Sequence, residues 1–312
     1  MEWREEMCIV SGSYQAIDGH PARTVVELWC RARAGHSVLL LVEGLRPYID
    51  VAQPGRPKPA VEAAESLEFL RQTNEVVEIA EPVDKWTPLG IKPHWRVYVR
   101  QPFLVRGLRR RIENEWEVSS ADILFVQRLL LDADLGPHIS AGGKILWAGE
   151  RAPDEIEKSS DRVMAAESIR DVGGSGLYPV DMVVHCNLCD LERAEPFPAP
   201  FVSFSYDLET SVKYNTILCA AAVIDRAGER TTHEFKGEES DIMEGLTRLV
   251  REEDPDIITG YNIDNFDLPR ILDRSELNSK RSRSNQAAMF GWGRVPIVES
   301  EIGTRSAGRV FP

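Results

Sequence analysis

The 312-residue sequence contains no apolar run approaching the ~20 residues that a membrane-spanning helix requires. Its charged first residues, Met-Glu-Trp-Arg-Glu-Glu, include no apolar signal core, which predicts a cytoplasmic protein without a membrane partner. Cysteine is scarce: the five residues are irregularly spaced, which favours a reducing compartment over a disulfide framework. Excess basic charge is also lacking, because the net charge is −13. Any binding to a polyanion must therefore depend on local clusters of Lys and Arg.

Two carboxylates lie two residues apart in Asp207-Leu208-Glu209-Thr210, directly after the apolar-rich run 201–206. That run predicts a strand, and alternate side chains of a strand share a face, so Asp207 and Glu209 should point the same way. Two like charges this close are unfavourable unless a cation lies between them. Mg²⁺ or Mn²⁺, which prefer oxygen ligands, are the natural candidates. A solvated strand end is the simpler alternative for this motif.

A third carboxylate follows later in the chain. The segment 254–262 predicts a turn and a short buried strand, Ile257 to Tyr261, and the helical spacing after it places Asp267 near the start of a helix. Two strands, 216–225 and 231–236, and one helix are predicted in between; the apolar positions of that helix are Ile242, Met243, Leu246, Leu249 and Val250. This order of elements is that of a ribonuclease-H-like α/β layer. In such a layer Asp267 could complete a two-metal site.

Both segments resemble exonuclease motifs of family B DNA polymerases. Asp207-Leu-Glu209-Thr is similar to the first motif, usually Asp-Ile-Glu-Thr, and the end of 254–267 is similar to the second, Asn-x-x-x-Phe-Asp. The resemblance implies a proofreading 3′–5′ exonuclease of DNA replication. In it Asp207, Glu209 and Asp267 would be catalytic and would hold two Mg²⁺ (or Mn²⁺) ions. Asn262 and Phe266 would position the primer 3′ end or support the motif.

The resemblance extends upstream to segments 46–49, 95–99 and 123–132, which are similar to the N-terminal domain of archaeal family B polymerases. Residues 92–111 include seven Lys and Arg and no acid. Strand alternation places Arg96, Tyr98 and Arg100 on one face, opposite an apolar face. We expect that face, with Arg109 and Arg110, to bind single-stranded template DNA. A charged strand edge that remains solvated is the alternative.

In archaeal relatives a pocket of the N-terminal domain captures uracil in the template strand. Leu104 and Arg106 depart from the Asp and Pro usual in that pattern, which leaves a plain turn and a packed helix as the alternative. A wall without room for the 5-methyl group would be enough to reject thymine. The positions that match the pocket pattern are Pro47, Tyr48, Pro102, Val105, Phe125 and Arg128.

The third exonuclease motif of the family, Tyr-x-x-x-Asp, has no counterpart, since no Tyr follows Tyr261 and no Asp follows Asp273. The palm carboxylates of the family are also lacking. We therefore expect the N-terminal portion of a family B polymerase, with DNA, a separate palm-bearing chain and a sliding clamp as partners. The sequence does not decide whether this chain is itself an enzyme. A non-catalytic DNA-binding subunit and a free-standing nuclease are alternatives, and the missing motif argues against the nuclease.

Together these observations predict an α/β chain with an α+β N-terminal part. The expected organisation is a template- and uracil-sensing-like domain at 1–145, a connector at 146–200, and a ribonuclease-H-like exonuclease domain, incomplete at its C-terminus, at 201–312.

Overall fold

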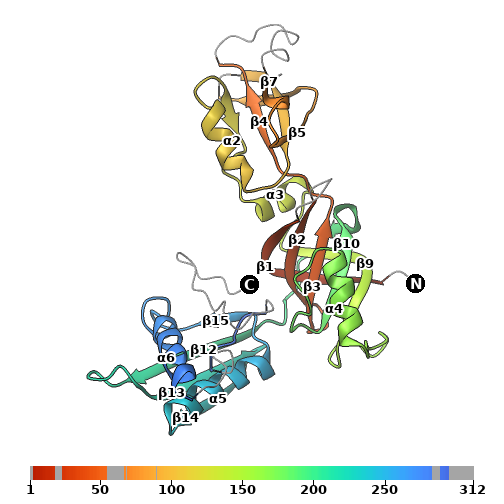
Figure 1. Cartoon of the computed structure of the whole chain (residues 1–312). Coiled ribbons are helices and arrows are strands. Elements are labelled where there is room, and N and C mark those ends of the chain that lie inside the picture. Colours follow the sequence, from red (N-terminus) through yellow and green to blue (C-terminus); the bar gives the residue numbers. More distant parts are fainter. Residues whose placement is uncertain are drawn as a thin grey trace.

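The computed structural model describes residues 3–17, 23–54, 67, 69–88, 90–282 and 289–294, the last two residues of the 90–282 stretch by their backbone only. Figure 1 shows three bodies in a row: a small sheet and helix at the top, a barrel-like sheet in the middle, and a sheet with two helices at the bottom. Within the described residues, no helix is long and apolar enough to cross a membrane.

The middle body is a closed sheet. β1 pairs with β2 and also with β9, so the order β1-β2-β3-β10-β9 returns to its first strand, and β11 extends it beyond β9. Every residue from Ser37 to Val42 is buried, because alternate side chains fill the barrel and the others pack outside it, in the core that α4 shares. Its elements are β1 (Trp3–Ile17), β2 (Arg23–Ala32), β3 (Ser37–Glu43), α3 (Phe125–Asp132), β9 (His138–Ala148), α4 (Arg162–Asp171), β10 (Met182–Asn187), the 3-10 turn η1 (Leu188–Asp190) and β11 (Leu191–Arg193).

The stretch 146–200 is not the connector that its composition predicts. It supplies β10, which pairs with β3 and β9 in the interior of the sheet, and α4, which buries Ala165 and Ile169. β10 has the sequence Met-Val-Val-His-Cys-Asn, and its first three residues are fully buried. Because polar loops flank this short apolar strand, the average composition of 146–200 does not reveal it.

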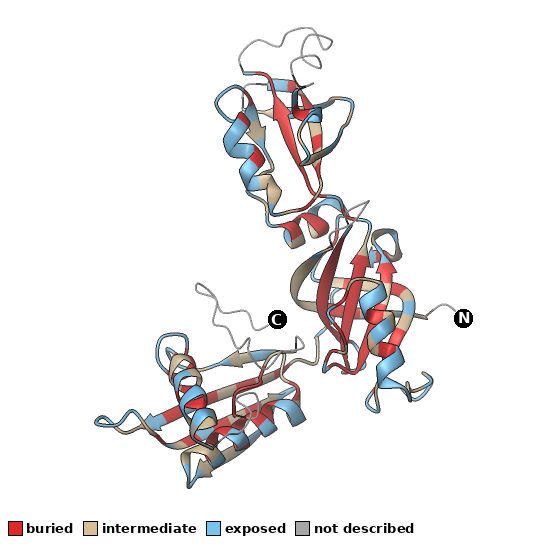
Figure 2. Ribbon diagram, viewed as in Figure 1, coloured by how far each residue is buried: buried red, intermediate tan, exposed pale blue. Residues whose placement is uncertain are grey.

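The top body is inserted between β3 and α3. Its sheet has the order β5-β7-β4-β8, with β6 also paired to β7, and α2 packs against it over a core that contains Trp95, Val97 and Leu108. Figure 2 shows buried residues concentrated on the central strands and on one side of α2. The elements are β4 (Tyr48–Ala52), β5 (Val76–Ile79), β6 (Val83–Thr87), β7 (Gly90–Val99), α2 (Leu104–Ile112) and β8 (Glu117–Ser119).

The bottom body has the predicted element order. Its sheet runs β14-β13-β12-β15, with β15 parallel to β12 and the other pairs antiparallel. All five apolar positions expected on the first helix are buried against the sheet, where they meet Leu268 and Ile271 of the second helix. The elements are β12 (Val202–Thr210), β13 (Ile217–Arg226), β14 (Glu229–Lys236), α5 (Glu239–Glu253), β15 (Ile257–Thr259) and α6 (Asp267–Ser282).

The prediction of a buried strand at 257–261 is wrong in two respects. β15 ends at Thr259, and Ile257 is 45% exposed. Only β12 pairs with β15 among the described strands, so β15 is an edge strand, and one of its faces meets solvent. Its apolar letters reflect strand propensity rather than full burial.

Candidate metal centre and nucleic-acid surface

The first carboxylate pair lies on the outer face of β12. Val202, Phe204, Tyr206 and Leu208 are buried, whereas Asp207 and Glu209 are exposed. The period of two therefore holds along the strand, and the prediction that both carboxylates share a face is confirmed. Their Cα atoms are about 6.5 Å apart by strand geometry.

The second motif returns to β12 through a tight loop after β15. A Cβ on Gly260 would lie 2.6 Å from the carbonyl oxygen of Tyr206, so only glycine allows the chain to pass this close to β12. Asn262 then adopts a left-handed backbone (φ 56°), and its side chain accepts a hydrogen bond from Asn265. Asparagine tolerates this conformation better than most residues. The loop thus directs the chain into α6 beside the end of β12.

Asp267 begins α6 and contacts the first motif. Its Oδ1 accepts a hydrogen bond from the backbone N–H of Leu208 at 3.2 Å, between the two carboxylates of β12. The side chain is almost fully buried, with 2% of the residue exposed. Burial raises the pKa of Asp267, and the nearby charge of Asp207 raises it further. In the described part of the chain, no ion pair involves Asp267, so this carboxylate is one for which a cation would be a favourable neighbour.

Glu209 shares the exposed face of Asp207 on β12. No group of three or more His, Cys, Asp or Glu side chains that could hold a metal ion occurs among the described residues. Two of the three predicted ligands therefore come together, and Glu209 lies one strand repeat farther along. Carboxylate oxygens are suitable donors for a hard divalent ion, so the residues present fit Mg²⁺ or Mn²⁺.

Three other residues of the second motif, Tyr261, Asn262 and Phe266, are exposed. Phe266 is 41% exposed and Tyr261 is 94% exposed, although both directly flank the loop that carries the carboxylate. The guanidinium of Arg270 lies 5.7 Å from the centre of the Phe266 ring. Asn262 is exposed as well. Exposed aromatic rings beside a carboxylate pair are suited to stacking against bases.

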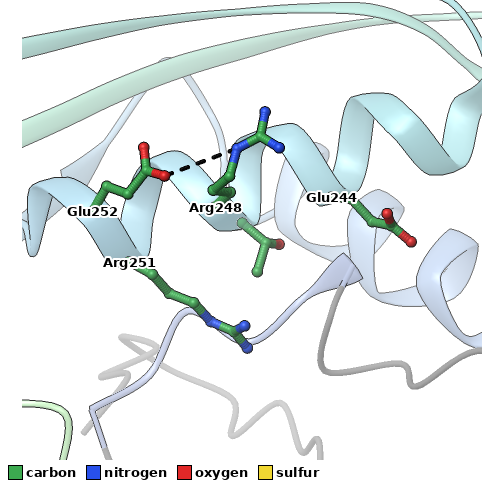
Figure 3. Close-up of a pocket in the computed structure, with 5 residues that line it drawn as sticks. Glu244, Arg248, Arg251 and Glu252 are labelled. Atoms are coloured by element: carbon green, nitrogen blue, oxygen red, sulfur yellow. Dashed lines mark ion pairs between the residues drawn. The ribbon is translucent and has the colours of Figure 1, made fainter.

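A shallow hollow on α5 does not coincide with this site. Figure 3 shows Glu244, Arg248, Arg251 and Glu252 around it, with Arg248 and Glu252 ion-paired at 3.9 Å. Arg251 donates to the carbonyl of Gly291, and Thr247 accepts from the indole of Trp292. The hollow is thus a seam between α5 and the segment 289–294, and none of the predicted site residues lines it.

In the top body, the alternation expected on β7 is present. Trp95, Val97 and Val99 are buried, while Arg96, Tyr98 and Arg100 are partly exposed on the other face. However, Arg96 is engaged internally: its Nε donates to Asp50 at 3.0 Å. The expected nucleic-acid surface is therefore less positive at β7 than the sequence suggests.

The basic residues of α2 differ among themselves. Arg109 pairs with Glu113 at 3.0 Å and Arg111 pairs with Glu75 at 2.5 Å. Among the described residues, Arg106 and Arg110 have no ion pair, and both are exposed. They are four positions apart and therefore neighbours on one face of the helix. Exposed Phe103 lies three positions before Arg106, on the same face.

The residues that match the uracil-pocket pattern fall into two groups. Tyr48 and Arg128 meet, with the guanidinium 3.9 Å from the ring centre. The guanidinium of Arg96 lies 3.6 Å from the same centre. Two guanidinium groups this close to one ring centre cannot share a face, so they enclose the ring from both sides. The Tyr48 hydroxyl donates to Asp132 at 2.8 Å, and burial together with this bond raises the pKa of Tyr48 to about 12.

The other positions of the pocket pattern have neighbours other than Tyr48 and its arginines. Phe125 is buried in the barrel core and meets Tyr14 edge-on at 5.4 Å. Val105 packs against the core of the top body, and Pro102 precedes the helix that carries it. Pro47 is buried, and its carbonyl accepts a hydrogen bond from Val99.

Two sets of residues were not predicted from the sequence. Asp50, fully buried in the top body, accepts from Lys85, Arg96 and Ser120. Arg31 of the barrel forms a bidentate pair with Asp256, directly before β15. The acids of Asp254-Pro255-Asp256 were visible in the sequence, but nothing in it indicated a partner 225 residues away.

Comparison with known proteins finds relatives that cover most of this chain. Residues 233–311 match the family model described as DNA polymerase family B, exonuclease domain. The DNA polymerase delta catalytic subunit of Oryza sativa subsp. japonica is 23% identical over 308 residues, which covers 81% of this chain and 26% of the relative. The DNA polymerase of Archaeoglobus fulgidus is 26% identical over 300 residues, covering 95% of this chain and 34% of the relative.

A solved structure shows the same fold. The family B DNA polymerase of the archaeon Pyrobaculum calidifontis superposes with a TM-score of 0.64 at 19% identity, over 91% of this chain and 33% of that one. The bottom body therefore has the fold of an exonuclease domain. The chain is similar to family B DNA polymerases over their N-terminal and exonuclease portion. It spans about a third or less of the length of these relatives.

The matches include a plant and an archaeal polymerase. The family predicted from the two motifs is therefore confirmed, while the archaeal character of the chain stays a prediction.

Proposed function

We propose that the chain supplies the first two carboxylate motifs of a metal-dependent 3′–5′ exonuclease, which proofreads during DNA replication. The observation that carries this proposal is the hydrogen bond from the Leu208 N–H to Asp267, which joins the two motifs. Asp207 lies next to that N–H on the exposed face of β12, and Glu209 follows on the same face. All three side chains are hard oxygen donors.

The proposed chemistry follows from the metal ions and the primer nucleotides that these residues would bind. Bound Mg²⁺ or Mn²⁺ would activate water and stabilise the developing charge on the leaving 3′ oxygen. Asp207, Glu209 and Asp267 would be its ligands. Phe266 and Asn262, exposed at the mouth of the loop, would orient the last nucleotides of the primer. Orientation of reactants accounts for a large share of such catalysis, so a chain without the Tyr and Asp of the third motif should be a weak nuclease.

The test is calorimetric titration of the whole chain with Mn²⁺. We expect weak binding in the wild type and a further loss in Asp207→Ala and in Asp267→Ala, because each change removes a ligand. Asp273→Ala, an exposed aspartate farther along α6, is the matched control and should bind as the wild type does. In the same samples, release of 3′ nucleotides from single-stranded DNA should be at trace level. Equal Mn²⁺ binding by all four proteins would contradict the proposal.

A second function, binding of single-stranded template DNA by the top body, is favoured by the exposed stripe on α2. Phe103, Arg106 and Arg110 offer one aromatic ring and two cations that no described acid neutralises. Stacking on an aromatic ring combined with phosphate contacts is the usual mode of sequence-independent single-strand binding. Tyr48 and its two arginines lie close to β7 and could add a preference for uracil over thymine. A separate polymerase chain and a sliding clamp would be the protein partners.

Fluorescence anisotropy with a labelled single-stranded oligonucleotide tests this second function. Arg110→Gln should weaken binding and reduce its salt dependence, because one phosphate contact and its released counterion are lost. Arg109→Gln is the matched control and should do less, since Arg109 already pairs with Glu113. Replacing one thymine by uracil should tighten wild-type binding by roughly tenfold to two-hundredfold if a methyl group is excluded. Equal effects of Arg110→Gln and Arg109→Gln would mean that the top body attracts DNA only nonspecifically.

A further inference from the structure

A cluster of three arginines and three aspartates joins the barrel to the exonuclease domain. From the barrel, Arg31 is 2% exposed, and its Nε donates to both oxygens of Asp256 at 3.1 and 2.9 Å. Its Nη2 also donates to the Asp254 carbonyl at 2.8 Å. We name this group the interdomain ion cluster; its members are Arg31, Arg151 and Asp181 of the barrel and Asp254, Asp256 and Arg294 of the exonuclease domain.

The barrel side of the cluster is firmly braced. Arg31 donates through Nη1 to the carbonyl of Gly35, in its own β2–β3 hairpin. Asp181, which directly precedes β10, accepts from the N–H and the hydroxyl of Ser37 and from Arg151 at 2.8 Å. These bonds hold Arg31 on β2 and hold Arg151, in the turn after β9, against Asp181. The barrel therefore presents a buried cation, Arg31, and a partly exposed one, Arg151, to the second domain.

Asp256 is the member that bears on the carboxylate site. Its backbone N–H donates to the carbonyl of Val202 at 2.8 Å, and its Oδ2 accepts from the N–H of Val202 at 2.9 Å. Val202 begins β12, and Asp256 directly precedes β15. One residue thus fastens the starting points of the two strands that lead to Asp207 and Asp267.

The hydrogen bonds between Asp256 and Val202 lie where the pairing of the parallel strands β12 and β15 begins. Their register, Ser203 with Ile257 through Ser205 with Thr259, begins next to Asp256. A slip of one residue would move every side chain of β15 to the other face. β15 has only three residues and β12 as its only partner among the described strands, so its own ladder specifies the register weakly.

The buried charge of Asp256 makes the fastening depend on the other domain. Its side chain has no exposed area. A buried carboxylate is unfavourable unless it is paired and hydrogen-bonded, and the planar fork of an arginine meets that need better than lysine does. Arg294 of the same domain contributes one contact at 3.3 Å, but Arg31 contributes the bidentate one.

We propose that Arg31 is a positioning residue for the exonuclease site: through Asp256 it holds β15 in register with β12 and so keeps Asp267 beside Asp207. The carboxylate pair is then assembled only while the barrel and the exonuclease domain are docked. The link to metal binding rests on the proposed function, whereas the link to strand register does not.

The experiment compares Arg31→Met and Arg31→Lys with the wild type. Hydrogen exchange measures the Leu208 amide, which donates to Asp267, and the Ala222 amide of β13, which lies on the side of β12 away from β15. We expect Arg31→Met to speed exchange at Leu208 far more than at Ala222, because the register of β15 loosens first. Mn²⁺ affinity should fall by roughly tenfold or more, the usual effect of losing an outer support of metal ligands. Arg31→Lys keeps the charge and loses the planar fork. Its exchange rate at Leu208 and its Mn²⁺ affinity should lie between those of the wild type and Arg31→Met.

Arg33→Met is the matched control. Arg33 lies two residues farther on and pairs with Glu6, and both partners are about half exposed. Arg33→Met should leave the exchange of the Leu208 amide and the Mn²⁺ affinity as in the wild type. If Arg31→Met does not fold, Arg31→Lys decides by the same two readouts. Unchanged Leu208 exchange in a folded Arg31 variant, or equal acceleration at Leu208 and Ala222, would overturn the proposal.

A wild type that binds no Mn²⁺ would remove the proposed metal site, but it would not decide the role of Arg31. In that case selective acceleration at Leu208 still supports strand positioning by Arg31, and its absence still refutes it.

Discussion

Two buried aspartates, one in the top body and one in the exonuclease domain, have opposite surroundings. Asp50 is 0% exposed and Asp267 is 2% exposed. Burial favours the neutral form of both, but hydrogen bonds from Arg96 and Lys85 outweigh it at Asp50 and lower its pKa. At Asp267 the charge of Asp207 adds to the effect of burial, and the pKa is raised.

The difference is that the protein itself supplies cations to Asp50, whereas the nearest charge to Asp267 is another carboxylate. The cluster around Asp50 is complete without any ligand, because two cations and the Ser120 hydroxyl already satisfy it. The Asp207–Asp267 pair is held in an electrostatically unfavourable arrangement that the rest of the domain enforces. Such pairs are typical of sites whose partner is a substrate or a cation.

The largest expected effect is a loss of stability in the top body when Asp50 is replaced. Asp50→Asn should destabilise the top body by about 3 kcal/mol, since it leaves Lys85 and Arg96 without their shared anion. Because the folded pKa is lowered, this contribution is complete above the unfolded value near 4 and is lost as pH falls through the folded value. Urea unfolding at pH 7 and pH 3 measures it.

Asp84→Asn, in neighbouring β6, removes an exposed aspartate and serves as the control. It should change the free energy of unfolding by less than about 0.5 kcal/mol. If Asp50→Asn were equally harmless, Asp50 would not be the structural counterpart that the comparison requires.

A smaller effect of opposite sign is expected for Asp267→Asn. The raised folded pKa means that ionised Asp267 destabilises the fold above that pKa. The amide can still accept the hydrogen bond from Leu208, so the variant should gain on the order of 0.5–2 kcal/mol at pH 7 without divalent ions. The gain should vanish at pH values below the unfolded pKa near 4, where both states of the wild type are protonated.

Thermal unfolding of Asp267→Asn and wild type at pH 7 and pH 3.5 provides the comparison. A lower stability of Asp267→Asn at pH 7 would mean that Asp267 is a structural residue like Asp50.

The exonuclease domain was predictable because its signals are local. The alternation along β12, the apolar face of α5 and the start of α6 at Asp267 each depend on a few neighbouring residues. β15 was predicted to be buried because apolar residues do not distinguish an edge strand from a central one. The fold match supports the domain as a whole, while the ligand roles of the three carboxylates stay predictions.

The N-terminal half was less predictable because its decisive contacts join distant segments. Tyr48 meets Arg96 and Arg128 through tertiary packing, and Asp50 receives Lys85 from another hairpin. β10 enters the barrel from a stretch that composition marks as a connector. A sequence shows that an arginine is present, but only the fold shows whether a neighbouring carboxylate has already neutralised it. Arg109 and Arg110, adjacent in sequence, differ in this respect.

The most direct test of the contrast is the pKa of the Asp267 carboxyl, followed by carbon-detected NMR as pH is varied, without and with saturating Mg²⁺. Without Mg²⁺ the pKa should lie above the ordinary aspartate value of about 3.9, and with Mg²⁺ it should fall below it, because the bound cation favours the charged form. The pKa of Asp50 should be low and insensitive to Mg²⁺ in the same spectra. An Asp267 pKa that is ordinary, or that Mg²⁺ does not change, would contradict the assignment of this carboxylate to a metal site.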